Sequence, residues 1–176
     1  MDLENRYGAH NYHPLPVVLD RGEGVYVWDV EGKRYYDFLS SYSAVNQGHC
    51  HPRIIKALED QAREITLTSR AFFNSKLGVF DQYVTEYFQF EKVLPMNSGA
   101  EAVETAIKTC RKYAQEVKGF PAEKTKIIVA DNNFHGRTTT IVSFSNDEDA
   151  REGYGPFTPG FIRIPYNDVD ALRKAF

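Results

Sequence analysis

The sequence VLPMNSGAE, residues 93–101, joins a short apolar run to a long amphipathic segment. This order predicts a strand over 93–96, a tight turn, and a helix that begins at Gly99. The first N–H groups of a helix have no partner inside it and lie at the positive end of the helix dipole. Because glycine lets an anion approach the backbone closely, the turn formed by Ser98, Gly99 and Ala100 is a candidate phosphate site.

The same residues also fit an ordinary helix start that binds no ligand. Ser98 is a preferred N-cap residue, and Glu101 three positions later completes the pattern of a capping box. The local pattern alone favours this simpler interpretation, because a motif of this kind indicates a ligand only when its surroundings agree.

The pattern beyond residue 93 is strand, helix, strand. Apolar residues recur at helical spacing over 99–117, and Glu104 and Lys108 are four residues apart on the outer side, where we expect them to pair. An uninterrupted β-branched run follows at 127–130, typical of a strand buried on both faces. This part of the chain therefore predicts the beginning of an α/β fold with a mostly parallel sheet, containing about three of its strands.

The first half of the chain has different periodicities. Short alternating apolar runs broken by glycines over 17–39 predict a small antiparallel meander, and 51–65 and 77–90 each carry one apolar helical face. We expect these helices to form core or interface stripes. The predicted organisation is a meander segment over 1–50, interface helices over 51–90, and the first part of a large α/β domain over 91–176.

A second group of unusual residues follows the predicted strand at 127–130. Phe134, His135, Gly136, Arg137 and Thr138 place an aromatic ring, an imidazole and a guanidinium at one strand end, where ligands bind in parallel sheets. Taken singly, Phe134 fits a core aromatic and Arg137 fits a surface salt bridge. Together with the phosphate turn, they suit a planar phosphorylated cofactor and an anionic substrate.

Composition excludes several classes of function. The chain has 176 residues, of which 42% are hydrophobic. Its formal net charge is −3, which does not favour nucleic-acid binding. No apolar stretch is long enough to span a membrane or to act as a visible signal peptide. Cys50 and Cys110 cannot form a disulfide framework, which favours a reducing compartment such as the cytoplasm, with the mitochondrial matrix as the alternative.

Several motifs together resemble a known family. The chain is similar to the class III, fold-type I aminotransferases that depend on pyridoxal phosphate, and within them to the branch that acts on ornithine. The similarity runs from Tyr7 to Leu172. The motifs that carry it are YGAHNY at 7–12, WDVEG at 28–32, SSYSAVNQGH at 40–49, LTSRAF at 67–72 and GPF at 155–157.

The resemblance implies a cofactor site. Ser98, Gly99 and Ala100 would bind the phosphate of pyridoxal phosphate through backbone N–H groups, and Phe134 would stack on its ring. His135 stands where close relatives are expected to have tryptophan, although its neighbours match, so its assignment to the cofactor site depends on those neighbours.

The resemblance also implies substrate contacts. Tyr12 and Arg137 would hold the α-amino and α-carboxylate end of ornithine, which turns the δ-amine toward the cofactor, and Tyr42 would help select ornithine. A guanidinium suits this role because it binds a carboxylate through two hydrogen bonds. The products would be glutamate semialdehyde and glutamate, with 2-oxoglutarate as the amino acceptor, and the protein would be a homodimer.

The chemistry of this family needs two groups that the chain does not show. One is the lysine that forms a Schiff base with the cofactor, and the other is an acid that keeps its ring nitrogen protonated. In the family both come later in the chain, and no lysine here has a matching context. Asn167 is predicted to cap a final helix that stops in mid-pattern at Phe176. We therefore expect an N-terminal portion that is inactive alone.

Three hypotheses of function remain from the sequence. The first is transfer of the δ-amino group of ornithine, and the second is the same chemistry on acetylornithine, γ-aminobutyrate or another ω-amine, which Tyr12 and Tyr42 disfavour. The third is a chain without catalysis that dimerises or binds a partner through residues 51–90. A metal site at His49, Cys50 and His51 is discounted, because neighbouring side chains in that run point in alternating directions.

Overall fold

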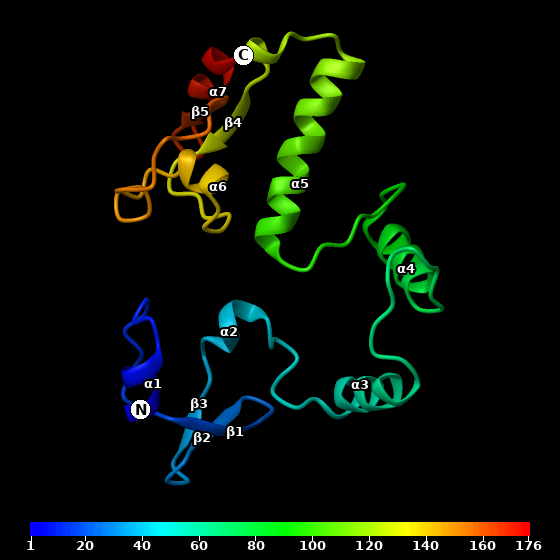
Figure 1. Cartoon of the computed structure of the whole chain (residues 1–176), viewed down its shortest axis with the longest axis vertical. Helices are drawn as coiled ribbons and strands as arrows, with labels where there is room; N and C mark the ends of the chain where they lie inside the picture. The colour runs from blue at the N-terminus through cyan, green and yellow to red at the C-terminus, as the bar shows by residue number, and fades with distance from the viewer. The chain divides into compact units, whose positions relative to one another are not determined.

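The computed structural model describes all residues from Met1 to Phe176. The chain divides into two compact units, Met1–Gly78 and Val79–Phe176, and each is described by itself. Figure 1 shows the helices and strands of both units in chain order.

The first unit is built on the antiparallel meander that the sequence predicts. Its strands are β1 (Leu19–Glu23), β2 (Tyr26–Asp29) and β3 (Arg34–Tyr36), paired in the order β1-β2-β3. Helix α1 (Asp2–Tyr7) comes before the sheet. A two-residue turn begins at Gly24, whose φ of 55° is a conformation that glycine adopts without steric cost.

Aromatic and cationic side chains stabilise the meander. The rings of Tyr26 and Tyr36 pack across β2 and β3 with centroids 4.8 Å apart, and the guanidinium of Arg21 lies 3.9 Å from the centroid of Trp28. Such cross-strand pairs contribute about 0.2–1 kcal/mol, and cation–π contacts at exposed sites contribute about 0.5–1 kcal/mol. Val27, on the middle strand, is the one residue of the sheet that is buried.

Two aspartates organise the turns of this unit. Asp29 accepts hydrogen bonds from the Glu31 N–H at 3.0 Å, the Lys33 N–H at 2.9 Å and the Tyr35 hydroxyl at 2.7 Å. The bond from Tyr35, followed by those from the backbone, lowers the pKa of Asp29. Asp37 has a similar set of bonds, and its pKa is also lowered. Both carboxylates are therefore stabilised in their charged form.

The predicted helices over 51–65 and 77–90 are confirmed as α3 (Pro52–Glu64) and α4 (Leu77–Phe88). His51 stands at the N-cap and Pro52 at the first helical position, where its missing N–H costs no hydrogen bond. A short turn, α2 (Ser40–Ser43), precedes α3. Neither α3 nor α4 has a buried residue, although α3 is strongly amphipathic.

The second unit contains the predicted α/β segment. Helix α5 (Gly99–Lys112) ends in the π-helical turn η1 (Tyr113–Val117), and Gly119 follows with a φ of 71°. The remaining elements are η2 (Ala122–Lys124), β4 (Ile127–Ala130), α6 (Thr139–Ser143), β5 (Phe161–Ile164) and α7 (Val169–Ala175). Strands β4 and β5 pair in parallel, with Ile127 opposite Phe161 and Ala130 opposite Ile164.

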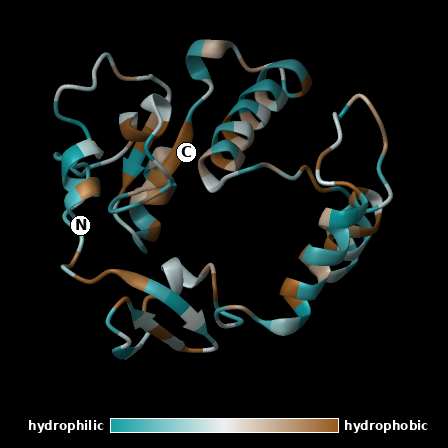
Figure 2. Cartoon of the chain, turned by 60° about the horizontal axis from the view of Figure 1, so that its bottom comes forward, coloured by the Kyte–Doolittle hydropathy of each residue, from teal (hydrophilic) through white to brown (hydrophobic).

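The core of the second unit lies between α5, α6 and the sheet. Ile107, Ile141 and Phe144 form its buried cluster, and the rings of Phe144 and Phe161 pack with centroids 4.5 Å apart. Partly buried apolar side chains from α5, β4 and β5 surround the cluster. Figure 2 shows β4 as a hydrophobic strand. This small core fixes the carboxyl end of β4 against the beginning of α5.

Two expectations about strands are wrong. Residues 93–96 form no strand, because a strand needs a hydrogen-bonded neighbour and the parallel sheet here consists of β4 and β5 alone. The strand at 127–130 is confirmed in position, but all four of its residues are half-buried. The apolar run predicted burial on both faces, which requires more cover than this unit provides.

The cap of the last helix is also shifted by one residue. Asn167 adopts a left-handed conformation with a φ of 62°, and Asp168 is the N-cap instead. Its carboxylate accepts a hydrogen bond from the Ala171 N–H at 2.8 Å. Either residue type can cap a helix, so the sequence pattern alone does not choose between them.

None of the helices combines the length and the apolar character that crossing a membrane requires.

The two aspartates generate a prediction about acid. A carboxylate whose pKa is lowered by folding stabilises the folded state at pH values above its ordinary pKa of 3.8. This stabilisation is lost as the pH falls through the lower pKa of the folded state. We expect the meander to lose this stabilisation as the pH falls below about 4, so that less denaturant unfolds it. Fluorescence of Trp28, the one tryptophan of the chain, reports this transition.

Asp29→Asn removes one of the two titrating groups and is expected to make the pH dependence shallower. Asp20→Asn is the control, since Asp20 is a carboxylate of the same meander but lies on strand β1 instead of in a turn. Equal pH profiles for wild type and Asp29→Asn would contradict the assignment.

Candidate functional site

The beginning of α5 is held by Ser98. Its backbone is extended, with φ −145° and ψ 162°, and its Oγ accepts a hydrogen bond from the Glu101 N–H at 3.2 Å. The Ser98 carbonyl accepts from the Ala102 N–H at 3.1 Å. The predicted N-cap is therefore confirmed, and it is worth about 1 kcal/mol.

The N-cap and a phosphate site use different donors of this first turn. Ser98 satisfies the Glu101 N–H, whereas the N–H groups of Gly99 and Ala100 have no acceptor within the helix. A Cβ atom added at Gly99 would meet no atom within 4 Å, so the space beside these donors is open. The Ser98 hydroxyl donates to Glu101 Oε2 at 3.4 Å, so the two backbone donors and the positive end of the helix dipole form the donor set that fits a phosphate.

The loop that follows β4 packs directly against this turn. Gly136 has a φ of 123°, and a Cβ built there would lie 2.9 Å from the Cβ of Ala100 and 3.1 Å from Cδ1 of Ile141. The Thr138 hydroxyl donates a hydrogen bond to Glu104 Oε1. The structure therefore brings two predicted site segments together: residues 98–100 and residues 134–138.

The bond from Thr138 corrects the expectation that Glu104 pairs with Lys108. Glu104 is half-buried and faces the loop after β4, so its carboxylate is one turn above Ala100 on the same side of α5. The sequence did not predict that Glu104 belongs to this site. The spacing of Ala100 and Glu104 by four residues was the available signal, because it places both on one helix face.

Asparagine side chains fix the other end of the loop. The Asn132 N–H donates to Asn146 Oδ1 at 2.7 Å, and Asn146 Nδ2 donates to Asn132 Oδ1 at 3.0 Å. Asn133 Nδ2 donates to the Ala130 carbonyl at 2.6 Å. Thr138 then caps α6 by accepting from the Ile141 N–H at 3.2 Å. The loop is therefore anchored on both sides of Phe134.

The three remaining predicted residues of this unit occupy different environments. Phe134 is 77% exposed, so its ring has a surface available for another planar group. The His135 ring lies 5.8 Å from the ring of the buried Phe144, which gives it a packing contact with the core. Arg137 is exposed beside Gly136.

Tyr12 and Tyr42 belong to the first unit, and both side chains are exposed. Tyr42 lies in α2, whose four residues all have positive φ: 48° at Ser40, 47° at Ser41, 56° at Tyr42 and 72° at Ser43. A left-handed turn costs about 1–2 kcal/mol for each residue that is not glycine. Four such residues in succession show that surrounding contacts hold this segment.

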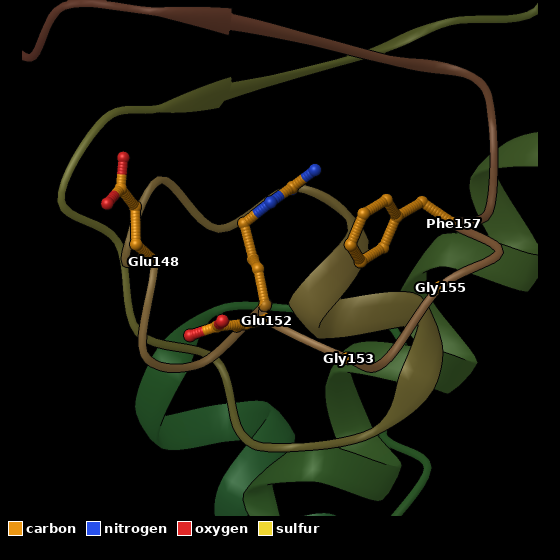
Figure 3. A pocket seen from close by; sticks show the side chains of 6 residues that line it. Glu148, Glu152, Gly153, Gly155 and Phe157 are labelled. Carbon is orange, nitrogen blue, oxygen red and sulfur yellow. The ribbon is translucent and has the colours of Figure 1, made fainter.

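A separate hollow of about 500 Å³ lies beside the loop from Glu148 to Phe157. Figure 3 shows the Glu148 carboxylate and the Phe157 ring on different sides of it. The guanidinium of Arg151 lies 4.0 Å from the centroid of the Phe157 ring and donates to the carbonyls of Val142, Ser143 and Ser145. Arg151 therefore organises this loop, and none of the predicted site residues lines the hollow.

The comparison with known families now decides the class of this protein. The family model described as aminotransferase class-III matches residues 7–175. The chain belongs to the class-III aminotransferases.

Curated members of this family are similar over nearly the whole chain. The mitochondrial ornithine aminotransferase of Drosophila ananassae is 61% identical over 172 residues, which cover 98% of this chain and 40% of that protein. The mitochondrial ornithine aminotransferase of Rattus norvegicus is 57% identical over 174 residues, which cover 99% of this chain and 40% of that protein. This class-III chain thus spans about 40% of the length of these relatives.

Solved structures agree with this placement. The ornithine aminotransferase from Toxoplasma gondii ME49 has a TM-score of 0.96 and 48% identity, covering 99% of this chain and 41% of that one. An acetylornithine aminotransferase from Elizabethkingia anophelis has a TM-score of 0.82 and 59% identity, covering 99% of this chain and 39% of that one. The expected fold, the N-terminal part of a fold-type I aminotransferase, is confirmed.

The geometry of the first turn of α5 generates a prediction for the full-length aminotransferase that carries this sequence. Gly99→Val is expected to weaken binding of pyridoxal phosphate by about tenfold or more, because a branched side chain occupies the open space beside the donors. Ser98→Ala is expected to weaken it less, by about threefold, because the backbone donors remain. Titration of the cofactor, followed by its absorbance, measures both.

Gly78→Val is the matched control, because Gly78 also lies in the first turn of a helix and has no atom within 4 Å of an added Cβ. Equal cofactor affinities for Gly99→Val and Gly78→Val would show that the turn is a helix cap and nothing more.

Proposed function

We propose that the full-length protein carrying this chain is an aminotransferase that moves the δ-amino group of ornithine to 2-oxoglutarate, giving glutamate semialdehyde and glutamate. The observation that carries the proposal is the open helix N-terminus at Gly99, packed against the loop at Gly136, in a chain that belongs to the class-III aminotransferases. The names of the relatives at 57–61% identity support ornithine as the substrate.

We assign the cofactor site to residues 98–100 with Phe134 and His135. The backbone N–H groups of the turn at Ser98, Gly99 and Ala100 suit the phosphate of pyridoxal phosphate, and the exposed Phe134 ring suits its pyridine ring. When bound, the cofactor supplies an electron sink for the amine carbon. This chain contributes binding and orientation, because no lysine in it has the sequence context expected for the Schiff-base residue.

Arg137 and Tyr12 would hold the amino-acid end of the substrate. A guanidinium binds a carboxylate through two hydrogen bonds, which fixes the direction of the substrate as well as its position. Holding the α-carboxylate and α-amine in this way leaves the δ-amine as the group that reacts. Tyr42 would contact the bound ornithine and help the enzyme to distinguish it from ω-amines that lack an α-amino group.

Acetylornithine is the second candidate substrate. The observation in its favour is the 59% identity to the acetylornithine aminotransferase from Elizabethkingia anophelis. Acetylation neutralises the α-amine and adds bulk there, so a site for this substrate needs more space and fewer acceptors around Tyr12 and Tyr42.

We also propose that the full-length protein is a homodimer and works in the cytoplasm or the mitochondrial matrix. The two cysteines, Cys50 and Cys110, are free and exposed, which suits a reducing compartment. The exposed apolar side chains of α3 and α4, such as Leu58 and Tyr83, support the proposal that a second subunit packs on these helices.

A screen of amine donors with the full-length protein tests the proposed reaction directly. We expect ornithine to have the highest kcat/KM among ornithine, acetylornithine and γ-aminobutyrate. Tyr42→Ile is expected to lower the preference for ornithine by about tenfold or more, because one well-placed polar contact contributes about 1–3 kcal/mol.

Tyr166→Ile is the control, since Tyr166 and Tyr42 are both 83% exposed and lose the same hydroxyl and ring. If Tyr42→Ile leaves the relative kcat/KM values unchanged, the role of Tyr42 in selectivity is wrong. If acetylornithine is the best substrate of the wild type, the second candidate replaces the first.

A further inference from the structure

We propose that Asp37 and His49 are positioning residues that hold Tyr42 in place and thereby set the amine preference of the enzyme. The inference rests on the proposed function, because it takes Tyr42 as a substrate contact. It assigns a role to two residues of the first unit that are not among the proposed cofactor or substrate contacts. Three features of the geometry carry it.

The first feature is the left-handed turn itself. None of the residues of α2 is glycine, yet Ser40, Ser41, Tyr42 and Ser43 all have positive φ. Three backbone bonds close the segment: the Tyr42 N–H donates to the Leu39 carbonyl at 2.9 Å, the Ala44 N–H to the Ser41 carbonyl at 3.2 Å, and the Val45 N–H to the Ser40 carbonyl at 3.2 Å. Such a conformation persists only where surrounding contacts hold it, so the backbone at the beginning of the turn has to be held in place.

The second feature is the carboxylate of Asp37, which holds the backbone at the beginning of the turn. Oδ1 accepts from the Leu39 N–H at 3.0 Å and from the Ser40 N–H at 2.8 Å. Oδ2 lies 2.7 Å from His49 Nε2. Since an ionised carboxylate only accepts hydrogen bonds, Nε2 carries the proton and donates it. The pKa of Asp37 is lowered, first by the bond from the Ser40 backbone and then by the bond from His49.

The third feature is the rigid placement of His49. Its N–H donates to the Gly24 carbonyl at 2.8 Å, and its carbonyl accepts from the Gly24 N–H at 3.0 Å, which ties it to the turn between β1 and β2. A Cβ added at Gly22 would lie 2.7 Å from Cγ of His49, so the imidazole rests directly on the β1 backbone. Both side chains of the Asp37–His49 pair are mostly buried, with 17% and 24% exposed.

The contacts form one continuous path from the meander to Tyr42. The hairpin holds His49, His49 orients Asp37, and Asp37 holds the two N–H groups at the beginning of the left-handed turn. Loss of one link frees the turn to relax toward ordinary backbone angles, which would displace the Tyr42 side chain without touching it. The expected consequence is loss of selectivity, since the fold of the meander has its own hydrogen bonds.

The test is the ratio of kcat/KM for ornithine to kcat/KM for γ-aminobutyrate in the full-length enzyme. Asp37→Ala and His49→Phe are expected to lower this ratio by about fivefold or more, because each removes a bond that holds the turn. His49→Gln keeps an N–H donor at the end of a side chain of suitable length and is expected to restore most of the ratio. Comparing His49→Phe with His49→Gln remains decisive if Asp37→Ala does not fold.

Asp29→Ala is the matched control. Asp29 also accepts two backbone N–H bonds and one side-chain bond in the same unit, but it holds the turn between β2 and β3. We expect the ornithine to γ-aminobutyrate ratio of kcat/KM in Asp29→Ala to stay within about twofold of the wild-type ratio, because the two sites are independent. In a Tyr42→Ile background, Asp37→Ala is expected to change the ratio no further, because both act through the same side chain.

Three results would overturn the inference: an unchanged ratio in Asp37→Ala, an equal loss in Asp29→Ala, or additive effects of Asp37→Ala and Tyr42→Ile. The proposed function fails by a different result, namely no preference for ornithine in the wild type. In that case the same variants are compared on the amine that the enzyme does prefer, and the positioning role is decided by the same criteria.

Discussion

The close contact between Gly136 and the first turn of α5 is the constraint on which the second unit depends. A helix N-terminus attracts anions wherever it occurs, but here the loop after β4 lies against it with no room for a Cβ at Gly136. The hydrogen bond from Thr138 to Glu104 and the buried cluster of Ile107, Ile141 and Phe144 keep the two segments in this arrangement. The proposed cofactor site thus depends on the packing of the Gly136 backbone against the side chains of Ala100 and Ile141 as much as on polar side chains.

The sequence predicted the elements whose signal is local. The apolar periodicity of α3, α4 and α5 and the β-branched run of β4 depend on residues close in the chain, and all four elements occur where they were expected. The N-cap at Ser98 is also local, since its acceptor and donor are three residues apart. The same holds for the meander, whose glycines mark its turns.

The features that sequence reasoning missed depend on distant partners. Residues 93–96 have the composition of a strand but no neighbour to pair with, and Glu104 bonds to Thr138, which is 34 residues away, instead of to Lys108. The left-handed turn at Ser40–Ser43 has no sequence signal, because serine and tyrosine do not prefer positive φ. It is held by bonds that the Leu39 and Ser40 N–H groups donate to Asp37, whose carboxylate is itself oriented by His49, 12 residues away.

The loop around Arg151 has a consequence for proteolysis. This loop has no apolar core of its own: one guanidinium nitrogen donates to three carbonyls, and the guanidinium lies on the ring of Phe157. Trypsin must draw an arginine side chain into its own specificity pocket before it cuts, so cleavage after Arg151 requires all of these contacts to break first. The loop conceals its own cleavage site, and a cut there would report local opening of the loop instead of simple exposure.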